Sequence, residues 1–371
     1  MAQGQGAWSA RRHGRGREGG GWRPNGPGAS AAQRRAQRMG QTLGWALNVT
    51  EYIFPGVPAS YDESHELLVR LPSEAEEDVP AMLLPPLLRH WSGPSTSTGP
   101  EVSVCIIYFH ANACDIGDCM ADMETLRDGA FGGDAVVLAP EYSGYGLLSD
   151  YEPTVDSIDL VARAAWRFSR HSLGFRREQI VLCGRSIGSG PAARLAQTAG
   201  AEAKDAAAGA CPRPGARKAV QSSRALGALL LLAPFTNIPD VVTAHTNSIV
   251  ASLVGPMWDV GELVREPGLR DVPMCVVHPR EDEVVPLELG QAVLERASPV
   301  PELKYGLWLS GASHNFDLET EHAHAVGAFI SEHLPAPDFG SAAVAVEEPA
   351  QQPLPGLQLT PGMLRGSSES L

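Results

Sequence analysis

The chain has 371 residues, of which 43% are hydrophobic and 19% charged. This apolar content is enough for a sizeable core and excludes a wholly disordered protein. The formal charge of −14 combines a basic start with an acidic body, because residues 1–39 hold eight arginines and a single acid. Phosphate affinity is largely electrostatic, so we expect no nucleic acid to bind the acidic body.

The cysteines and the apolar runs indicate the environment of the protein. The six cysteines are scattered and mostly embedded in apolar runs, which is typical of free thiols in a reducing compartment. Cys114 and Cys119 lie close to two aspartates, but no second ligand pair with zinc spacing follows, so we expect no metal. The longest apolar run, Ala225–Pro234, is about half of a membrane span. We expect a cytoplasmic monomer with at most peripheral membrane contact.

Composition divides the chain into three regions. Residues 1–42 are rich in Gly and Arg, and residues 336–371 are rich in Pro, Ser and Gly; both predict disordered extensions. The region 43–335 is predicted to be one α/β domain. Within it, the Ala/Lys/Gly-rich stretch 200–224 is predicted to be a disordered insertion.

Short apolar runs alternate with helical patterns through the domain. This alternation predicts a mostly parallel, doubly wound sheet of about eight strands with helices on both faces. Glu66–Leu87 is expected to add one or two antiparallel edge strands. The first two parallel strands, Val102–Phe109 and Ala135–Pro140, are predicted to follow each other with no helix between them. The parallel strands are predicted at Val102–Phe109, Ala135–Pro140, Ile180–Cys183, Leu226–Ala233, Met274–His278 and Leu303–Leu309. Helices are predicted at Val155–His171, Ile187–Thr198, Leu287–Ala297 and Leu318–Leu334.

The pentapeptide at residues 184–188, Gly-Arg-Ser-Ile-Gly, follows an apolar strand and opens a helix. This is the context of a nucleophile elbow, in which a sharp turn lifts a serine to the edge of the sheet. The turn presses backbone against backbone, so a side chain two places before or after the serine would clash. The pattern predicts Ser186 as a nucleophile.

A nucleophilic serine needs a base, because its hydroxyl is a weak nucleophile at its own pKa. In this topology the expected chain order is serine, acid, histidine. A small-residue loop at residues 310–315 follows the last predicted strand and presents His314 at the end of that strand. We predict His314 as the base and assign the other histidines, His278 among them, to packing or to the surface.

The acid is expected after the penultimate strand, where Glu281, Asp282 and Glu283 are adjacent. Chemistry alone leaves the choice among these carboxylates open. We prefer Asp282, because a short carboxylate in the middle of the turn can reach the imidazole while its neighbours face solvent. An acidic surface loop without a catalytic role is the alternative, and Asp240 is then the fallback acid.

Catalysis also needs backbone N–H groups directed at the developing oxyanion. One is expected from Ile187, the residue after the nucleophile, and the other from the loop after Val102–Phe109, where we predict the Asn112 amide. Asp115 either braces this loop through side-chain hydrogen bonds or only forms a turn.

Several collinear motifs together carry a resemblance. The matching blocks are residues 53–55, 58–61, 110–117, 141–146, 184–191, 281–284 and 311–315, within about 50–335. On these blocks the chain resembles the α/β-hydrolase superfamily, specifically the family of α/β-hydrolase domain-containing protein 17 and its Bem46-like relatives. The resemblance implies the α/β-hydrolase fold, with Ser186 as nucleophile, Asp282 as acid and His314 as base. It also implies hydrolysis of esters or thioesters, with removal of palmitate from cysteine thioesters as the activity associated with the nearest relatives.

Three features depart from this family. Ala111 stands where the family usually has glycine, so the oxyanion loop is strained or shifted if that position needs a positive φ. The pair Pro279-Arg280 replaces Gly-Thr before the acid, which could turn Asp282 away from the imidazole. The depalmitoylases of the family carry a lipidated cluster of N-terminal cysteines, whereas no cysteine precedes Cys105 here.

The segment between Phe235 and Pro273 has fewer than forty residues, so only a short cap is expected over the site. An open groove suits an acyl group presented by a protein, or a small ester or thioester. Trp258, Met257 and Leu253 are candidates to line an acyl channel, and core packing of a short cap helix explains them equally well.

Two other functions are compatible with these motifs. A serine aminopeptidase or oligopeptidase shares the triad but would need a capped or acidic site for the peptide amine. A non-catalytic binding protein with the hydrolase fold is suggested by Ala111 and Pro279-Arg280, and the complete set of Ser186, Asp282 and His314 argues against it. The triad chemistry needs no metal or organic cofactor.

Overall fold

The structure is a computed structural model that describes residues 53–74, 77–87, 104–209, 224–246, 251, 254 and 257–334. The predictions for residues 1–42, for residues 336–371 and for Leu253 lie outside this part. Most of the predicted insertion, 210–223, lies outside it too.

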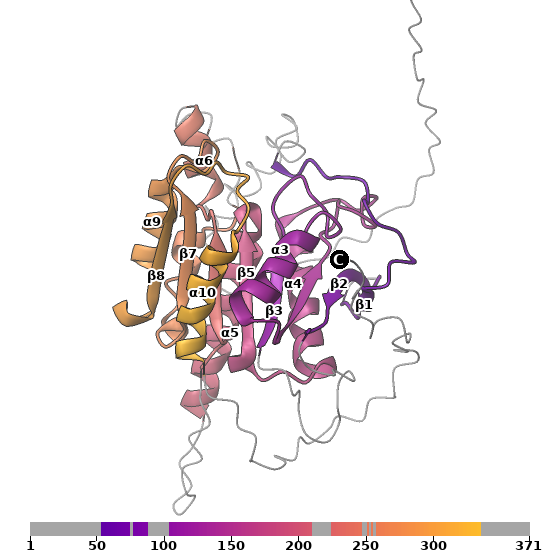
Figure 1. Cartoon of the computed structure of the whole chain (residues 1–371), viewed down its shortest axis with the longest axis horizontal. Helices are drawn as coiled ribbons and strands as arrows, with labels where there is room; N and C mark the ends of the chain where they lie inside the picture. Colours follow the sequence, from indigo (N-terminus) through magenta and orange to yellow (C-terminus); the bar gives the residue numbers. More distant parts are fainter. Residues whose placement is uncertain are drawn as a thin grey trace, which may run out of the picture.

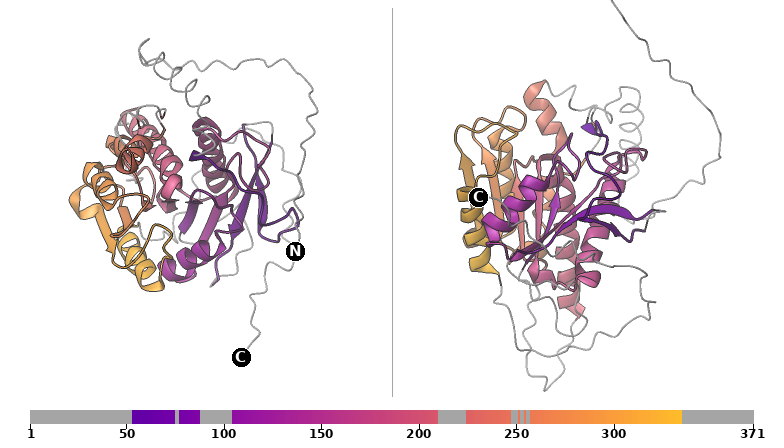
Figure 2. Two further views of the ribbon diagram at one scale, coloured as in Figure 1. Left: turned by 90° about the horizontal axis from the view of Figure 1, so that it is seen from above. Right: turned by 45° about the vertical axis from the view of Figure 1, so that its right-hand side comes forward.

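The described residues form one eight-stranded sheet with helices on both faces (Figures 1 and 2). The strands lie in the order β1-β2-β4-β3-β5-β6-β7-β8. β1 pairs antiparallel with β2 and β2 with β4, whereas the later pairs are parallel. Their bounds are β1 (Leu68–Leu71), β2 (Val79–Leu84), β3 (Val104–Phe109), β4 (Ala135–Pro140), β5 (Ile180–Arg185), β6 (Ala228–Leu232), β7 (Met274–Pro279) and β8 (Lys304–Leu309). This is the strand order of the α/β-hydrolase fold, so the predicted fold class is confirmed.

The central strands are apolar along their whole length because both of their faces are covered. Every residue of β3 (VCIIYF) and of β6 (ALLLL) is buried. Such continuous apolar runs are typical of parallel strands between two helix layers. For this reason the predicted bounds of the six parallel strands agree with the structure to within two residues at each end.

Successive side chains of each strand point to opposite helix layers. Ile107 and Phe109 of β3 face one core, and Ile106 and Tyr108 face the other. The side of Ile107 is covered by α4 (Val155–Arg167), α5 (Ser189–Gly209), α8 (Val260–Leu263) and α9 (Leu287–Arg296). The side of Ile106 is covered by α3 (Met120–Thr125), its π-helical continuation η1 (Leu126–Ala130) and α10 (Thr320–His333), which lie side by side in Figure 1.

The structure corrects the prediction that β3 leads directly into β4. Helix α3 and η1 lie between these two strands. Because β3 and β4 are parallel neighbours, the chain has to cross over the sheet between them, and a helix is the usual connection. The sequence MADMET of α3 buries only Met123, so its apolar periodicity is too weak to reveal the helix.

The structure also corrects the start of the predicted insertion at residue 200. Helix α5 continues to Gly209, well into the stretch 200–224. Five of residues 201–208 are alanine, the strongest helix former, which explains why the helix continues there.

The described part of the connection between β6 and β7 holds only short elements. It contains α6 (Ile238–His245), α8 and a turn at Pro267–Leu269. This agrees with the short cap expected from the length of the segment. Among the helices of the described residues, none has the length and apolar character that crossing a bilayer requires.

Candidate active site

Ser186 lies at a strained turn between β5 and α5. Its φ is +51°, in the left-handed region that costs free energy for a residue with a side chain. A Cβ on Gly184 would lie 2.4 Å from the carbonyl oxygen of Gly188, and a Cβ on Gly188 would lie 2.2 Å from that of Phe109. Both positions therefore require glycine, as the elbow motif predicts.

The loop after β8 brings His314 to this serine across 128 positions of sequence. Ser186 Oγ lies 2.9 Å from His314 Nε2, and His314 Nδ1 lies 2.8 Å from Asp282 Oδ2. An ionised carboxylate can only accept hydrogen bonds, so Nδ1 carries the ring proton. Nε2 is then free to accept the proton of the Ser186 hydroxyl.

Asp282 is held by several donors besides His314. Its Oδ1 accepts from the amides of Val284 at 2.9 Å and Val285 at 2.7 Å, and its Oδ2 lies 3.4 Å from His278 Nε2. Burial alone would raise the pKa of Asp282, but hydrogen bonds from His278, His314 and the Val285 amide hold it well below its usual range. The carboxylate is therefore ionised at neutral pH.

His278 is a site residue that our sequence interpretation missed, because we assigned it to packing or to the surface. It is fully buried, and its Nε2 lies 2.8 Å from the Val285 carbonyl oxygen besides contacting Asp282. A Cβ on Gly290 would come within 2.2 Å of its Nδ1, so α9 packs directly on the ring. The available signal was its position at the end of β7, four residues before the acid.

The carboxylates beside Asp282 are exposed, as expected, and each also accepts a hydrogen bond from the loop that carries His314. Glu281 accepts from the amide of Gly311 at 2.8 Å, and Glu283 accepts from the amide of His314 at 3.2 Å. The acidic turn therefore binds the backbone of the histidine loop as well as its ring.

Asp240, the fallback acid, has a different role. Its carboxylate accepts from Thr236 and Asn237, and its amide donates to the Asn237 side chain at the start of α6. Its hydrogen bonds are local to this helix start, and it is Asp282 that pairs with His314.

The predicted oxyanion loop lies against the elbow. β3 and β5 are neighbours with Phe109 opposite Gly184, and Gly188 packs on the carbonyl groups that end β3. Asn112 is held in place, because its Nδ2 donates to the Ile53 carbonyl oxygen at 2.7 Å and its Oδ1 accepts from Tyr145 at 2.6 Å. The use of the Ile187 and Asn112 amides stays a prediction.

The two departures in the site loops leave this arrangement intact. The left-handed residue of the oxyanion loop is Ala113, with a φ of +57°, and not Ala111. The loop therefore accepts a Cβ at position 111. Pro279 ends β7, the amide of Arg280 donates to the Leu309 carbonyl oxygen at 2.7 Å, and Asp282 still faces the imidazole.

Asp115 braces the oxyanion loop through side-chain hydrogen bonds. Its carboxylate accepts from the hydroxyl of Ser60 at 2.7 Å and from the amide of Asp118 at 2.9 Å. The bond with Ser60 joins the loop to a segment 55 positions earlier, and the bond with the Asp118 amide closes a local turn. Asp115 therefore has both of the roles considered for it.

Arg185, next to the nucleophile, was not singled out by the sequence. Its guanidinium lies 2.7 Å from Asp122 of α3, donates to the carbonyl oxygen of Phe316 and lies 4.9 Å over the ring of Phe316. Tyr108 donates to the same Asp122 carboxylate. Arg185 therefore ties the end of β5 to the loop that carries His314.

Core packing accounts for Trp258, one of the three candidates for an acyl channel. Trp258 is 2% exposed, donates to Asp159 at 2.9 Å and meets the ring of Phe54 edge-on. Burial raises the pKa of Asp159 to about 6, against the Trp258 hydrogen bond. Met257 is partly buried against the same core, and Leu253 lies outside the described residues.

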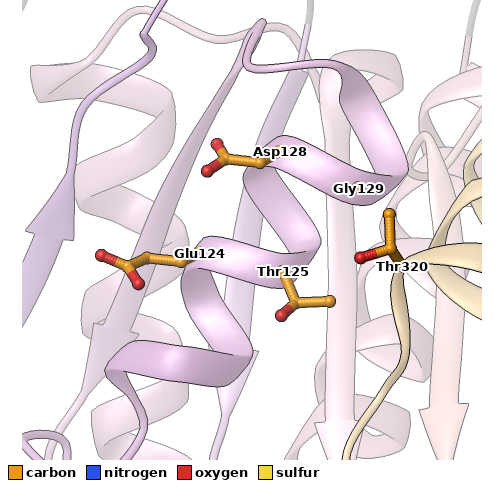
Figure 3. A pocket seen from close by; sticks show the side chains of 5 residues that line it. All are labelled: Glu124, Thr125, Asp128, Gly129 and Thr320. Atoms are coloured by element: carbon orange, nitrogen blue, oxygen red, sulfur yellow. The ribbon is translucent and has the colours of Figure 1, made fainter. Parts of the chain in front are cut away.

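A surface hollow of about 290 Å³ lies between α3, η1 and the start of α10 (Figure 3). It is lined by Glu124, Thr125, Asp128, Gly129 and Thr320. None of these residues belongs to the predicted site, and the two carboxylates make the hollow acidic. It offers no acyl channel.

Side chains at the start of α10 form one group of possible metal ligands within the described part of the chain. Glu319, Glu321 and His322 bring their ligand atoms within 4.8 Å of one another. Exposed acidic groups of this kind are common without a metal, so we assign none.

The chain is similar in sequence to curated α/β-hydrolases. It is 27% identical to alpha/beta hydrolase domain-containing protein 17C of Mus musculus over 237 residues, which cover 64% of this chain and 62% of the mouse protein. It is 26% identical to the human 17B protein over 236 residues, 69% of that protein. The match to the mouse and human 17C proteins spans about 60% of their length. No family model matches the chain.

Among the solved structures that align with the chain are an esterase domain, a serine hydrolase homologue and a peptidase. Est1E from Butyrivibrio proteoclasticus aligns with a TM-score of 0.47 and 16% identity, over 72% of this chain and 98% of that one. A serine hydrolase homologue from Coxiella burnetii aligns with a TM-score of 0.42 and 17% identity, over 74% and 100%.

Proposed function

We propose that this chain is a serine hydrolase that cleaves esters and thioesters, and that its substrates are long-chain acyl thioesters of proteins. The observation that carries the proposal is the hydrogen-bonded series from Ser186 through His314 to Asp282 at a strained elbow. The left-handed φ of Ser186 costs free energy in the folded state, and strain of this kind persists where function needs it.

The proposed reaction begins when Ser186 Oγ attacks the acyl carbonyl carbon. His314 Nε2 takes the hydroxyl proton, while Asp282 holds the other ring nitrogen and stabilises the imidazolium. The amides of Ile187 and Asn112 bind the oxyanion of the tetrahedral intermediate, at about 3 kcal/mol for each donor.

Collapse of that intermediate releases the thiol or alcohol, which takes the proton from His314. Water then attacks the acyl-enzyme with His314 again as the base, and the acid product leaves. The low pKa of Asp282 supports this cycle, because the acid stays ionised in each protonation state of the imidazole.

The preference for protein thioesters rests on the family resemblance and on the short connection above the sheet. Between β6 and β7 the described residues form only short helices. The short cap that we expect from the length of this segment suits an acyl group that is attached to another protein.

The test is covalent labelling of the purified full chain with a fluorophosphonate probe. We expect the wild type to be labelled and Ser186→Ala and His314→Ala to lose labelling, with turnover reduced by about 10⁴- to 10⁶-fold. Ser149→Ala and His324→Ala are matched controls at exposed positions and should keep wild-type labelling. No labelling of folded wild-type protein would overturn the catalytic proposal in favour of a binding protein.

The substrate class is tested with acyl thioesters and p-nitrophenyl esters of increasing chain length, beside aminoacyl and peptide amides. We expect long-chain thioesters to turn over fastest. Faster cleavage of short esters would make the chain a general esterase, and faster cleavage of amides would make it a peptidase with the same triad.

A further inference from the structure

A buried carboxylate that the proposed mechanism does not use lies against the oxyanion loop, residues 110–116. Glu141 directly follows β4, His110 directly follows β3, and both side chains are fully buried. His110 Nε2 lies 3.3 Å from Glu141 Oε1, and neither atom has a hydrogen-bond partner elsewhere among the described residues. A buried polar group without a partner costs free energy, so each of these two atoms depends on the other.

The second oxygen of Glu141 serves two further donors. Its Oε2 accepts from the hydroxyl of Tyr61 at 2.8 Å and from the amide of Ile116 at 3.4 Å. Gly146 leaves the space for this oxygen, because a Cβ there would lie 2.0 Å from it. Tyr61 belongs to a segment 80 positions before Glu141. One carboxylate therefore contacts both ends of the loop 110–116 and a segment that is distant in sequence.

The start of the loop also packs against the nucleophile elbow. A Cβ on Gly188 would lie 2.2 Å from the carbonyl oxygen of Phe109 and 2.7 Å from that of His110. The ring of Tyr142 stacks on His110 at 3.8 Å, and its hydroxyl donates to the His110 carbonyl oxygen at 3.0 Å. His110 therefore contacts the elbow through its backbone and Glu141 through its side chain.

The middle of the loop holds strain and carries a proposed oxyanion donor. Ala113 has a φ of +57°, which costs free energy and persists only where the surrounding structure over-determines it. The amide before it in the chain, that of Asn112, is the second donor of the proposed mechanism. Ile53 and Tyr145 hold the Asn112 side chain, whereas Glu141 holds the two ends of the loop.

We propose that Glu141 is a positioning residue for hydrolysis, whose two carboxylate oxygens hold the ends of the oxyanion loop so that the Asn112 amide stays directed at the oxyanion. This inference rests on the proposed function, because it assigns a role to the loop that binds the oxyanion. Glu141 acts through His110 and Ile116 rather than on the reacting atoms. A displaced donor affects the transition state more than substrate binding, because the oxyanion forms only after Ser186 attacks.

The first experiment compares two substitutions of Glu141 in the full chain by turnover of a p-nitrophenyl ester. His110 Nδ1 donates to the Ala111 carbonyl oxygen at 2.9 Å, so the Nε2 of a neutral ring can accept from the amide group in Glu141→Gln. The amide oxygen of that variant can still accept from Tyr61 and Ile116. Glu141→Leu fills similar space but leaves all three groups without this partner.

We expect Glu141→Leu to lower kcat about 100-fold and to change KM less than about threefold, as for the loss of one oxyanion donor. Glu141→Gln should keep kcat within about threefold of the wild type. A wild-type kcat in Glu141→Leu would overturn the proposal. Equal losses in the two variants would overturn the part that the hydrogen bonds play in it.

A transition-state analogue separates positioning from a general loss of structure. A trifluoromethyl ketone forms a hemiketal with a nucleophilic serine, and its oxygen then occupies the oxyanion site. We expect Glu141→Leu to bind this ketone about 100-fold more weakly, in parallel with the fall in kcat/KM. Asp159→Leu is the matched control, because Asp159 is a buried carboxylate whose partner Trp258 lies in the core. The folded control should bind the ketone as the wild type does, and unchanged binding to Glu141→Leu would overturn the positioning role.

Tyr61→Phe tests the same contacts with little change in volume. It removes only the hydroxyl that donates to Glu141, so it decides the question if Glu141→Leu does not fold. We expect kcat to fall about fivefold at an unchanged KM. Tyr305→Phe, where the ring stacks on Phe329 in the other core, is the control and should match the wild type. Wild-type kcat in Tyr61→Phe would then overturn the proposal.

Hydrogen exchange of the loop gives a readout that needs no catalysis. We expect peptides that cover residues 110–118 to exchange at least about tenfold faster in Glu141→Leu than in the wild type. Glu141→Gln and Asp159→Leu should exchange at the wild-type rate in these peptides. Equal rates in Glu141→Leu and the wild type would overturn the hold of Glu141 on the loop. These rates are read by mass alone, so they test that hold even if the folded wild type hydrolyses nothing and the hydrolase proposal fails.

Discussion

Replacing Arg185 by methionine is expected to destabilise the fold and to slow hydrolysis. The side chain of Arg185 is 11% exposed and that of its partner Asp122 is 20% exposed. Methionine fills similar space but leaves the Asp122 carboxylate without its ion pair and the Phe316 carbonyl group without its donor. Removing one partner of a buried pair typically costs 3–5 kcal/mol, and partial exposure of Asp122 places our expectation at about 3 kcal/mol.

A loss of about 3 kcal/mol lowers the folding equilibrium constant by roughly 100-fold. With a urea dependence of about 3 kcal/mol per molar for a domain of this size, the unfolding midpoint should fall by about 1 M. Because Phe316 is two residues after His314, we also expect kcat to fall about tenfold or more while KM changes little.

The assay is urea unfolding followed by circular dichroism, with turnover of a p-nitrophenyl ester measured on folded protein. Arg167→Met is the matched control, because Arg167 pairs with Glu74 at an exposed site where each side chain is half exposed. Such a pair contributes up to about 1 kcal/mol. In the double variant with Asp122→Leu, the loss should be smaller than the sum of the two single losses.

The reasoning would be refuted if Arg185→Met were no less stable than Arg167→Met. It would also be refuted if the two substitutions at positions 185 and 122 were additive. If Arg185→Met were less stable but had an unchanged kcat, the ion pair would contribute to stability alone. Arg185 would then have no role in positioning His314.

Three other changes follow from single contacts. Gly188→Ala places a Cβ 2.2 Å from the Phe109 carbonyl oxygen and should cost more than about 3 kcal/mol in urea unfolding, whereas Gly132→Ala, with open space around it, should cost about 1 kcal/mol. Asp282→Asn should leave folding intact and lower kcat by about 10⁴-fold, because asparagine favours the wrong tautomer of the imidazole; a loss below tenfold would contradict the assigned role. Burial raises the pKa of Asp159 to about 6, above an unfolded value of about 3.9, so the folded state binds more protons between pH 4 and 6. The free energy of unfolding should therefore fall by about 3 kcal/mol as pH rises through this window. Asp159→Asn should remove this pH dependence from the urea midpoints. An unchanged pH dependence in that variant would assign the effect to another group.

Local patterns in the chain were sufficient for the strands and for the elbow. Parallel strands between two helix layers must be apolar on both sides, so each appears as a short continuous run such as VCIIYF. The elbow requires glycine on both sides of Ser186 because backbone meets backbone there. The chain order of strand ends then placed His314 and the turn around Asp282 at one edge of the sheet.

Elements without a strong pattern escaped prediction for an equally physical reason. Helix α3 buries a single side chain, so its sequence carries almost no helical periodicity, and only the parallel pairing of β3 with β4 demands it. The continuation of α5 beyond residue 200 lies in an alanine-rich stretch, where composition resembles both a linker and a helix.

The contacts that complete the site join residues far apart in the chain, and no local pattern encodes which distant residues meet. Arg185 reaches Phe316 across 131 positions, and Glu283 binds the amide of His314 across 31. His278 could have been suspected from its strand end, yet its contact with Asp282 depends on how the turn at 280–285 folds back. The residues that chemistry requires are visible in order along the chain, whereas the side chains that hold them in place follow from packing of the completed sheet.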